Sequence, residues 1–81
     1  MMNDIRTLDE LAVGERGFVT DVLAGGDMGQ RLRDIGLISG TEVMCARISP
    51  LGDPAAFLIR GAIMALRRED ASRVRIVRGG I

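Results

Sequence analysis

The fold of this chain is decided by residues 42–66, which read EVMCARISPLGDPAAFLIRGAIMAL. Three runs within this stretch are rich in the apolar and β-branched residues that strands prefer: 42–48, 55–60 and 63–66. Gly61 separates the last two runs, and a glycine at such a position predicts a bulge or a bend. The stretch therefore predicts consecutive short strands joined by tight connections.

The connection Ser49–Pro54 (SPLGDP) combines turn-forming residues with one apolar residue. The prolines preset φ, Gly52 allows a positive φ, and Asp53 can bond its own backbone, so we expect a stiff hairpin loop. Such a turn has no need of Leu51. The Leu51 side chain therefore either folds onto the sheet or stands exposed as an anchor for a partner.

The residues on either side of this stretch predict further short elements. Residues 17–23 and 74–77 read as strands because β-forming residues dominate both. Thr7 and Glu10 have the spacing of a capping box, which predicts a single helical turn there. Residues 67–72 (RREDAS) predict a polar helical turn.

Residues 27–37 (DMGQRLRDIGL) are the best helix candidate in the chain. Asp27 can cap the first turn. Gly36 is a natural left-handed stop, and Leu37 is the apolar residue that then folds back on the helix. The apolar face of the helix is expected to consist of Met28, Leu32 and Ile35.

Five short strands with one embedded helix predict a mainly-β fold, most simply a small, strongly bent antiparallel sheet that closes into a partly open barrel. The 81 residues contain no βαβ alternation, internal repeat or linker. We therefore expect residues 1–81 to form one domain.

Composition excludes several classes of site. The chain has no His, so acid–base or nucleophile chemistry built on histidine is ruled out. Cys45 is the single cysteine, so it cannot form an internal disulfide or a typical zinc site. We predict no catalytic residue, no metal site and no cofactor, and we expect Cys45 to be a small buried hydrophobic residue.

Charge is balanced overall but uneven along the chain. Residues 1–27 hold six acidic residues and two arginines, whereas residues 60–81 hold six arginines and two acidic residues. We expect the two ends to lie side by side and neutralise each other. Zero net charge and only two aromatic residues argue against nucleic-acid binding. No apolar run is long enough to cross a bilayer and no signal peptide is visible, so a cytoplasmic protein is expected.

The chain contains the motifs RLRDIGL at 31–37, SPLGDP at 49–54 and MALRREDA at 64–71. Together these motifs resemble the FeoA family, the small cytosolic proteins of bacterial ferrous iron uptake. Ile35 and Ser49 stand where leucine and alanine are commoner in that family. The resemblance implies an SH3-like barrel and a non-enzymatic role in iron transport.

The resemblance also implies a partner, the cytosolic GTP-binding region of the FeoB-type ferrous iron permease. We expect no binding to nucleic acid and no direct insertion into the membrane. The formation of a weak homo-oligomer remains an open alternative. We predict interface residues in the loop and in the helix with its cap, where the resemblance is dense: Leu51, Asp53, Arg31, Arg33, Leu37 and Met28.

Two other functions fit a small barrel. One is a stand-alone regulatory domain, related to the SH3-like domain that ends some metal-responsive transcriptional repressors. Those repressors also need a helix-turn-helix domain and metal ligands, and this chain shows neither. The other is a free-standing nucleic-acid-binding barrel, which the neutral charge and the scarcity of aromatic residues disfavour.

Overall fold

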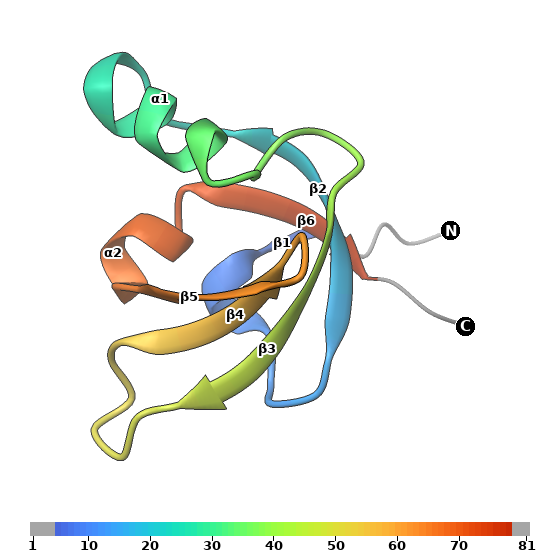
Figure 1. Cartoon of the computed structure of the whole chain (residues 1–81), viewed down its shortest axis with the longest axis vertical. Coiled ribbons are helices and arrows are strands. Elements are labelled where there is room, and N and C mark those ends of the chain that lie inside the picture. Colours follow the sequence, from blue (N-terminus) through green and yellow to red (C-terminus); the bar gives the residue numbers. More distant parts are fainter. Residues whose placement is uncertain (1–4, 79–81) are drawn as a thin grey trace.

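Six short strands form one antiparallel sheet in the computed structural model, which describes residues 5–78 (Figure 1). The elements in chain order are β1 (Ile5–Thr7), η1 (Leu8–Glu10), β2 (Arg16–Val22), α1 (Gly26–Asp34), β3 (Glu42–Ile48), β4 (Ala55–Ile59), β5 (Ala62–Leu66), α2 (Arg68–Ala71) and β6 (Val74–Arg78). The strands lie in the order β1-β6-β2-β3-β4-β5, so β1 and β5 are the two edges. The predicted mainly-β class is confirmed.

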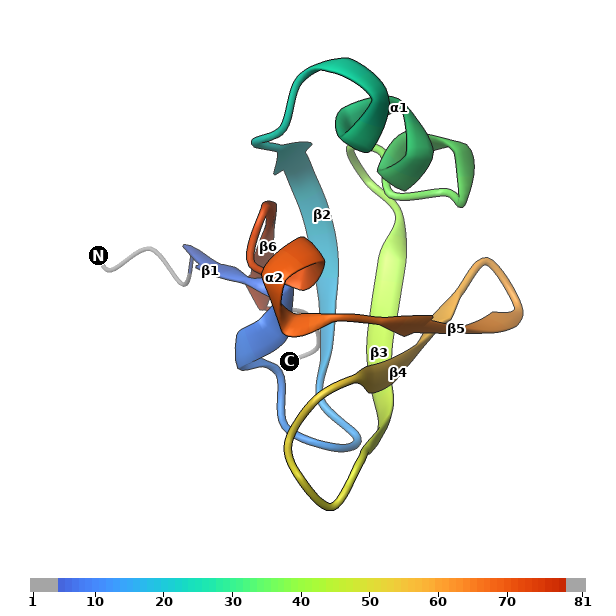
Figure 2. The ribbon, with the colours of Figure 1, turned by 90° about the vertical axis from the view of Figure 1, so that its left-hand side faces the viewer.

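The sheet curves strongly, as the view turned by 90° shows (Figure 2). The 3-10 helix η1 contacts both α2 and β6, and α1 contacts β2. At the start and end of the described chain, β1 pairs with β6 so that Ile5 lies opposite Val77. The fold therefore brings the first and last described strands together.

The structure has six strands where the sequence predicted five. The additional strand, β1, has three residues and pairs only with β6. A segment this short cannot show the alternation of apolar and polar residues by which a strand is recognised. By contrast, the predicted helical turn after Thr7 is confirmed, and the backbone N–H of Thr7 donates to Oε1 of Glu10 at 3.1 Å.

The prediction of a bulge or bend at Gly61 was wrong in detail. Arg60 and Gly61 have φ values of 52° and 84° and form the two-residue turn of the β4–β5 hairpin. Positive φ at both central residues is the signature of the type I′ turn, whose twist matches that of paired strands. The irregularities in strand pairing lie elsewhere, between Val19 and Asp21 and between Cys45 and Arg47.

One hydrophobic core fills the concave side of the sheet. Its most deeply buried members include Leu8, Val19, Leu32, Leu37, Val43, Cys45, Phe57, Ile59, Val74 and Ile76. Cys45 is fully buried among them, as predicted. Burial, more than any other factor, raises the pKa of its thiol, and the negative charge of Glu15 raises it further. Cys45 is therefore a packing residue.

Helix α1 uses the predicted apolar face. Leu32 is buried, and Met28 and Ile35 are partly buried against the core. The helix begins one residue earlier than predicted, after Gly25, and Asp27 lies within its first turn. The prediction that Asp27 is the N-cap was therefore wrong.

The predicted C-terminal stop of α1 is confirmed. Gly36 has a φ of +112°, and its N–H donates to the carbonyl of Arg33 at 2.9 Å. The N–H of Leu37 donates to the carbonyl of Leu32 at 3.2 Å. These two bonds define a Schellman motif, in which the residue after the glycine folds back as an apolar contact.

The two oppositely charged ends neutralise each other across β2 and β6. Arg75 makes a bidentate contact with Asp21, with Nε to Oδ1 at 3.0 Å and Nη2 to Oδ2 at 2.9 Å. Glu15 lies 3.2 Å from Arg78 and 3.5 Å from Arg6. The pKa of Asp21 is lowered mainly by its hydrogen bond from Arg75, and the pKa of Glu15 mainly by the backbone N–H of Ala12. These ion pairs therefore join segments of the fold that are distant in sequence.

None of the helices within residues 5–78 has both the length and the apolar character needed to cross a membrane.

Candidate functional site

The SPLGDP loop between β3 and β4 is fixed by its own hydrogen bonds. The N–H and Oγ of Ser49 both donate to the carbonyl of Pro54, at 3.1 Å and 2.7 Å. Gly52, at a φ of +90°, donates its N–H to the carbonyl of Ser49 at 2.8 Å. Leu51 is 95% exposed at the tip. Of the two placements that the sequence left open for Leu51, the structure shows the exposed one.

Asp53 connects the loop, which precedes β4, to the start of α2, which follows β5. Its Oδ1 accepts the backbone N–H of Arg68 at 2.9 Å, and Arg68 is the first residue of α2. The expectation that Asp53 bonds its own backbone was therefore wrong, because the acceptor caps a helix that starts 15 residues later. This bond further restrains the loop that carries Leu51.

The predicted interface residues do not form one surface. Leu37 is fully buried in the core, so its side chain is unavailable to a partner. Arg31 and Arg33 are exposed on α1, and Met28 is partly buried under it. Figures 1 and 2 place α1 and the SPLGDP loop at opposite ends of the longest axis, which measures 35 Å over the Cα atoms. The structure therefore brings Leu51 and Asp53 together but separates them from the arginines of α1.

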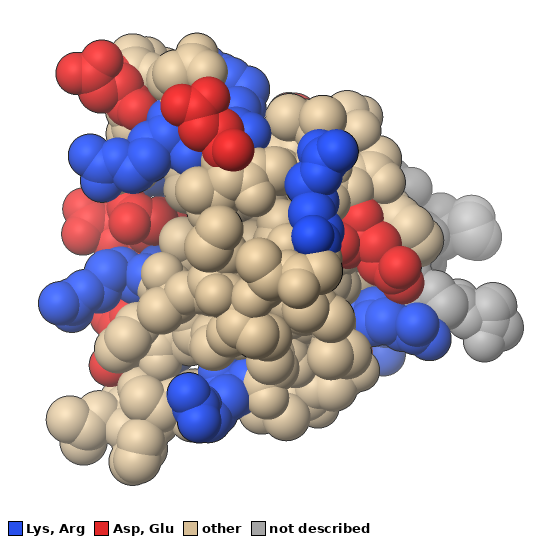
Figure 3. Space-filling model, viewed as in Figure 1, with Lys and Arg blue, Asp and Glu red and all other residues tan. Residues whose placement is uncertain are grey.

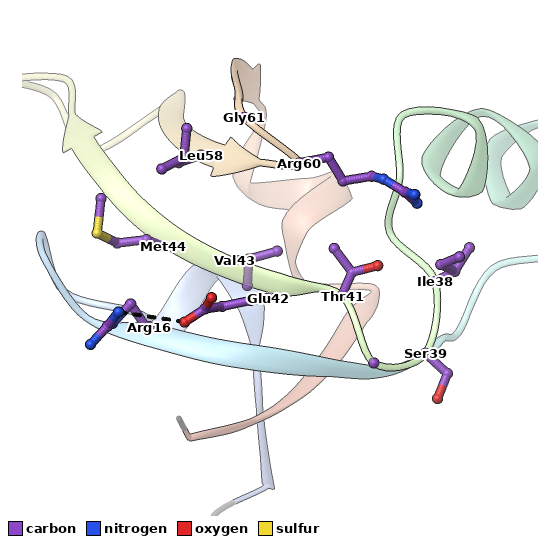
Figure 4. Close-up of a pocket in the computed structure, with 11 residues that line it drawn as sticks. Arg16, Ile38, Ser39, Thr41, Glu42, Val43, Met44, Leu58, Arg60 and Gly61 are labelled. Carbon is purple, nitrogen blue, oxygen red and sulfur yellow. Dashed lines mark ion pairs between the residues drawn. The ribbon is translucent and has the colours of Figure 1, made fainter. Parts of the chain in front are cut away.

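A second surface, which the sequence analysis missed, lies between the segment that follows α1 and the neighbouring ends of β3 and β4 (Figure 4). We call this groove of about 630 Å³ the outer groove. Ile38, 44% exposed, lies on one wall, and Met44 and Leu58 contribute apolar side chains from β3 and β4. The outer groove is thus an open apolar surface beside the helix that carries Arg31 and Arg33.

Charged side chains border the outer groove. Arg16 and Glu42 form an ion pair at 3.6 Å between β2 and β3, and both are about half exposed (Figure 4). Arg60 also lines the groove. Within the part of the chain that the structure describes, no acidic side chain lies within 4.0 Å of the Arg60 guanidinium. Among the described residues, the groove therefore offers a cation without an acidic partner next to an apolar surface.

A partly exposed apolar row extends from the outer groove to the edge of the sheet. Met44 lies opposite Leu58, and Leu58 lies opposite Ile63, so the three side chains share one face of β3, β4 and β5. Ile63 is 58% exposed. Figure 3 shows an uncharged surface over these strands, with charged side chains towards its margins.

The sequence did contain a signal for this row. The segments 43–45 and 57–59 are apolar at every position, whereas a strand with one solvated face alternates. The buried residues of these segments face the core, and Met44 and Leu58 face outwards. The uninterrupted apolar residues in β3 and β4 therefore indicated that the outer face of these two strands is also apolar.

The described residues form no cluster suited to metal binding. Within residues 5–78, no three side chains of His, Cys, Asp or Glu come close enough to hold a metal ion. Cys45 is buried, and this burial raises the pKa of its thiol.

Comparison with known proteins gives the family. The family model described as the FeoA domain matches residues 6–78. A curated relative, the Fe(2+) transport protein A/Fe(2+) transporter FeoB fusion protein of Porphyromonas gingivalis, is 29% identical over 69 residues. The match covers 85% of this chain and 8% of that protein, so the chain spans a small part of the relative's length.

Solved structures agree with the family match. The FeoA protein of Chlorobium tepidum is 35% identical, with a TM-score of 0.82 over 89% of this chain and 69% of that one. The zinc complex of Stenotrophomonas maltophilia FeoA, described as a prokaryotic SH3 domain protein, is 31% identical, with a TM-score of 0.78 over 86% and 87%.

A manganese-dependent transcriptional repressor is also similar, with a TM-score of 0.82 over 96% of this chain and 44% of that one. At 18% identity this likeness concerns the fold alone. The family model, by contrast, spans nearly all the described residues, and two solved structures above 30% identity are those of FeoA proteins. This chain therefore belongs to the FeoA family, and it has the SH3-like fold of that family.

Proposed function

We propose that this chain is a non-enzymatic accessory protein of ferrous iron uptake, which binds the cytosolic GTP-binding region of a FeoB-type permease and modulates transport. The observation that carries the proposal is the match to a protein named as a fusion of FeoA with FeoB. Fusion holds two domains at a high effective concentration, which favours partners that act on each other. The absence of histidine and the burial of Cys45 support a role without catalysis.

The anchor that we propose for this contact is Leu51. Its side chain is almost fully exposed, and the hydrogen bonds of Ser49, Gly52 and Asp53 hold its loop in place before binding. A fixed loop avoids part of the ordering cost, about 0.5–1.5 kcal/mol per immobilised side chain. Arg31 and Arg33 are further candidates, and a partner would contact them together with Leu51 only by spanning the long axis.

The test is a titration of the isolated cytosolic GTP-binding region of the permease, with and without guanine nucleotide. Leu51→Asp should weaken binding by about 1–2 kcal/mol, or roughly tenfold in Kd, while the fold survives. Ile38→Asp tests the outer groove in the same way. The matched control is Val13→Asp, because Val13 is also an exposed apolar residue, at 60%, outside both surfaces.

The outcomes separate function from contact surface. If the wild-type chain does not bind the cytosolic region in either nucleotide state, the proposed function is refuted. If binding occurs and folded Leu51→Asp behaves like Val13→Asp, the loop is not the anchor. A loss confined to Ile38→Asp would assign the contact to the outer groove.

The alternative function, a stand-alone regulatory domain related to metal-responsive repressors, has only the fold in its support. Measurement of GTP hydrolysis by the permease region, with and without this chain, separates the two. A change in hydrolysis or in affinity supports the transport role.

A further inference from the structure

The edge strand β5 has backbone groups that pair with no other described strand. Ile59 and Ala62 flank a two-residue turn and face each other, so they exchange backbone hydrogen bonds. The pattern alternates along the pair, and the N–H and C=O groups of Ile63 and Ala65 therefore point away from β4. Since β5 ends the strand order, no described strand lies on that side.

Nothing in the sequence of β5 protects this edge. Its residues, AIMAL, include no charge and no proline, which are the usual devices that prevent edge-to-edge pairing. Ile63 projects from it as the end of the row that begins at Met44 and Leu58. A strand added beside Ile63 would continue this apolar row by one more residue.

Arginine residues flank both ends of β5, and Glu69 and Asp70 follow the arginine pair at its C-terminal end. Arg60 lies in the turn before the strand, and Arg67 and Arg68 follow it. All three residues are exposed. Within residues 5–78 none of them has an acidic side chain within 4.0 Å of its guanidinium. An uncharged edge between arginines that have no acidic partner among the described residues favours a segment whose ends are acidic.

The same charges disfavour a second copy of this chain. Two β5 strands paired antiparallel about Met64 would place Arg60 of each copy opposite Arg68 of the other. Both ends of such a pair would then bring like charges together, which is unfavourable. The charge pattern therefore selects against self-pairing.

We propose that β5 docks an extended segment of another protein, which adds to the sheet as a seventh strand. The segment has an uncharged, β-forming centre that pairs with Ile63 and Ala65, and acidic residues beside Arg60 and Arg67. Backbone hydrogen bonds supply the affinity, and the flanking charges select the partner. This docking mode does not depend on which protein supplies the segment, so its test stands apart from the permease experiment.

The test uses a fluorescently labelled peptide, Asp-Asp-Val-Thr-Val-Thr-Val-Asp-Asp, which is acidic at both ends so that either strand direction is served. Ala65→Pro removes one outward N–H and leaves the bonds to β4 intact, because proline is tolerated on an edge strand. Arg67→Glu reverses one flanking charge. The matched control is Arg31→Glu, because Arg31 is exposed on α1 and likewise has no acidic partner in the described chain.

We expect the peptide to bind the wild type and to shift the amide resonances of Ile63 and Ala65 most strongly. Ala65→Pro should abolish binding, and Arg67→Glu should weaken it by about fivefold or more relative to Arg31→Glu. If Ala65→Pro does not fold, Arg67→Glu and a peptide with lysines in place of the aspartates decide the question.

Several results would overturn the proposal. They are no binding at about 1 mM peptide, equal binding of the acidic and the lysine peptides, and undiminished binding to folded Ala65→Pro. A wild-type dimer that becomes monomeric in Ala65→Pro would also overturn it, because the occupant of the edge would then be a second copy.

Discussion

Replacement of Gly36 by alanine probes the junction between α1 and the outer groove. An ideal Cβ at Gly36 would lie 2.5 Å from Cδ and 3.1 Å from Cγ of Arg60, and 3.3 Å from Cγ2 of Ile59. The residue also has a φ of +112°, which L-amino acids rarely adopt. Gly36→Ala therefore meets both a backbone penalty and a steric one.

The two penalties can be estimated separately. A side chain at positive φ costs about 1–2 kcal/mol, and forced repacking of close neighbours costs about 1–3 kcal/mol. We expect Gly36→Ala to lower the free energy of unfolding by about 2–5 kcal/mol in total. The control is Gly14→Ala, because Gly14 has a φ of +90° and no atom within 4 Å of its ideal Cβ. That control should cost only the backbone part, about 1–2 kcal/mol.

Far-UV circular dichroism is the suitable measurement, since the chain has no Trp or Tyr for fluorescence. A domain of this size loses about 4–8 °C in Tm per kcal/mol, so Gly36→Ala should melt at least about 4 °C below Gly14→Ala. In an Arg60→Ala background the cost of Gly36→Ala should move towards that of the control. Equal destabilisation by Gly36→Ala and Gly14→Ala would refute the assigned contact with Arg60.

Three further predictions concern the loop, the ion pairs and the buried thiol. Asp53→Ala should destabilise the fold by about 0.5–2 kcal/mol because α2 loses a cap. Asp53→Asn is the control, since it keeps an acceptor oxygen. Urea unfolding that shows Asp53→Ala to be as stable as the wild type would contradict this prediction. Since the pKa of Asp21 lies below its ordinary 3.8 in the fold, its ion pair with Arg75 stabilises the protein above that pH and is lost as the pH falls through the folded value. The stability difference between wild type and Asp21→Asn should therefore be present at pH 7 and shrink below pH 3.8, and a difference independent of pH would rule out this role. Cys45 should react with a thiol reagent only as fast as the protein opens, so rapid modification of the native protein would contradict its burial.

Elements that depend on local sequence were predicted well. The capping box at Thr7, the apolar face of α1 and the glycine stop at Gly36 are each encoded within a few residues, and all three are confirmed. The strands from β2 to β6 follow β-forming runs. Arg60 shows where this reasoning fails, because an arginine at positive φ is uncommon and the turn was therefore taken for a bend.

The candidate site was predicted less well because it depends on how elements meet in space. Asp53 bonds a residue on α2 beyond an intervening hairpin, which no local rule anticipates. The SPLGDP loop and α1 both carry motifs on which the resemblance to the family rested, yet the fold places them at opposite ends. The sequence predicts two roles for Leu37, as the apolar contact at the helix stop and as an interface residue, and its complete burial fits the first.

The pairing of β1 with β6 has a consequence for how this domain can be linked to others. Because Ile5 lies opposite Val77, a polypeptide enters and leaves the sheet at neighbouring points. A unit with this geometry can be placed inside or beside another chain without long spacers, since only a short gap must be closed. Because these entry and exit points are adjacent, the domain can be joined to other domains with little strain. This geometry agrees with the match to one part of a much longer fusion protein.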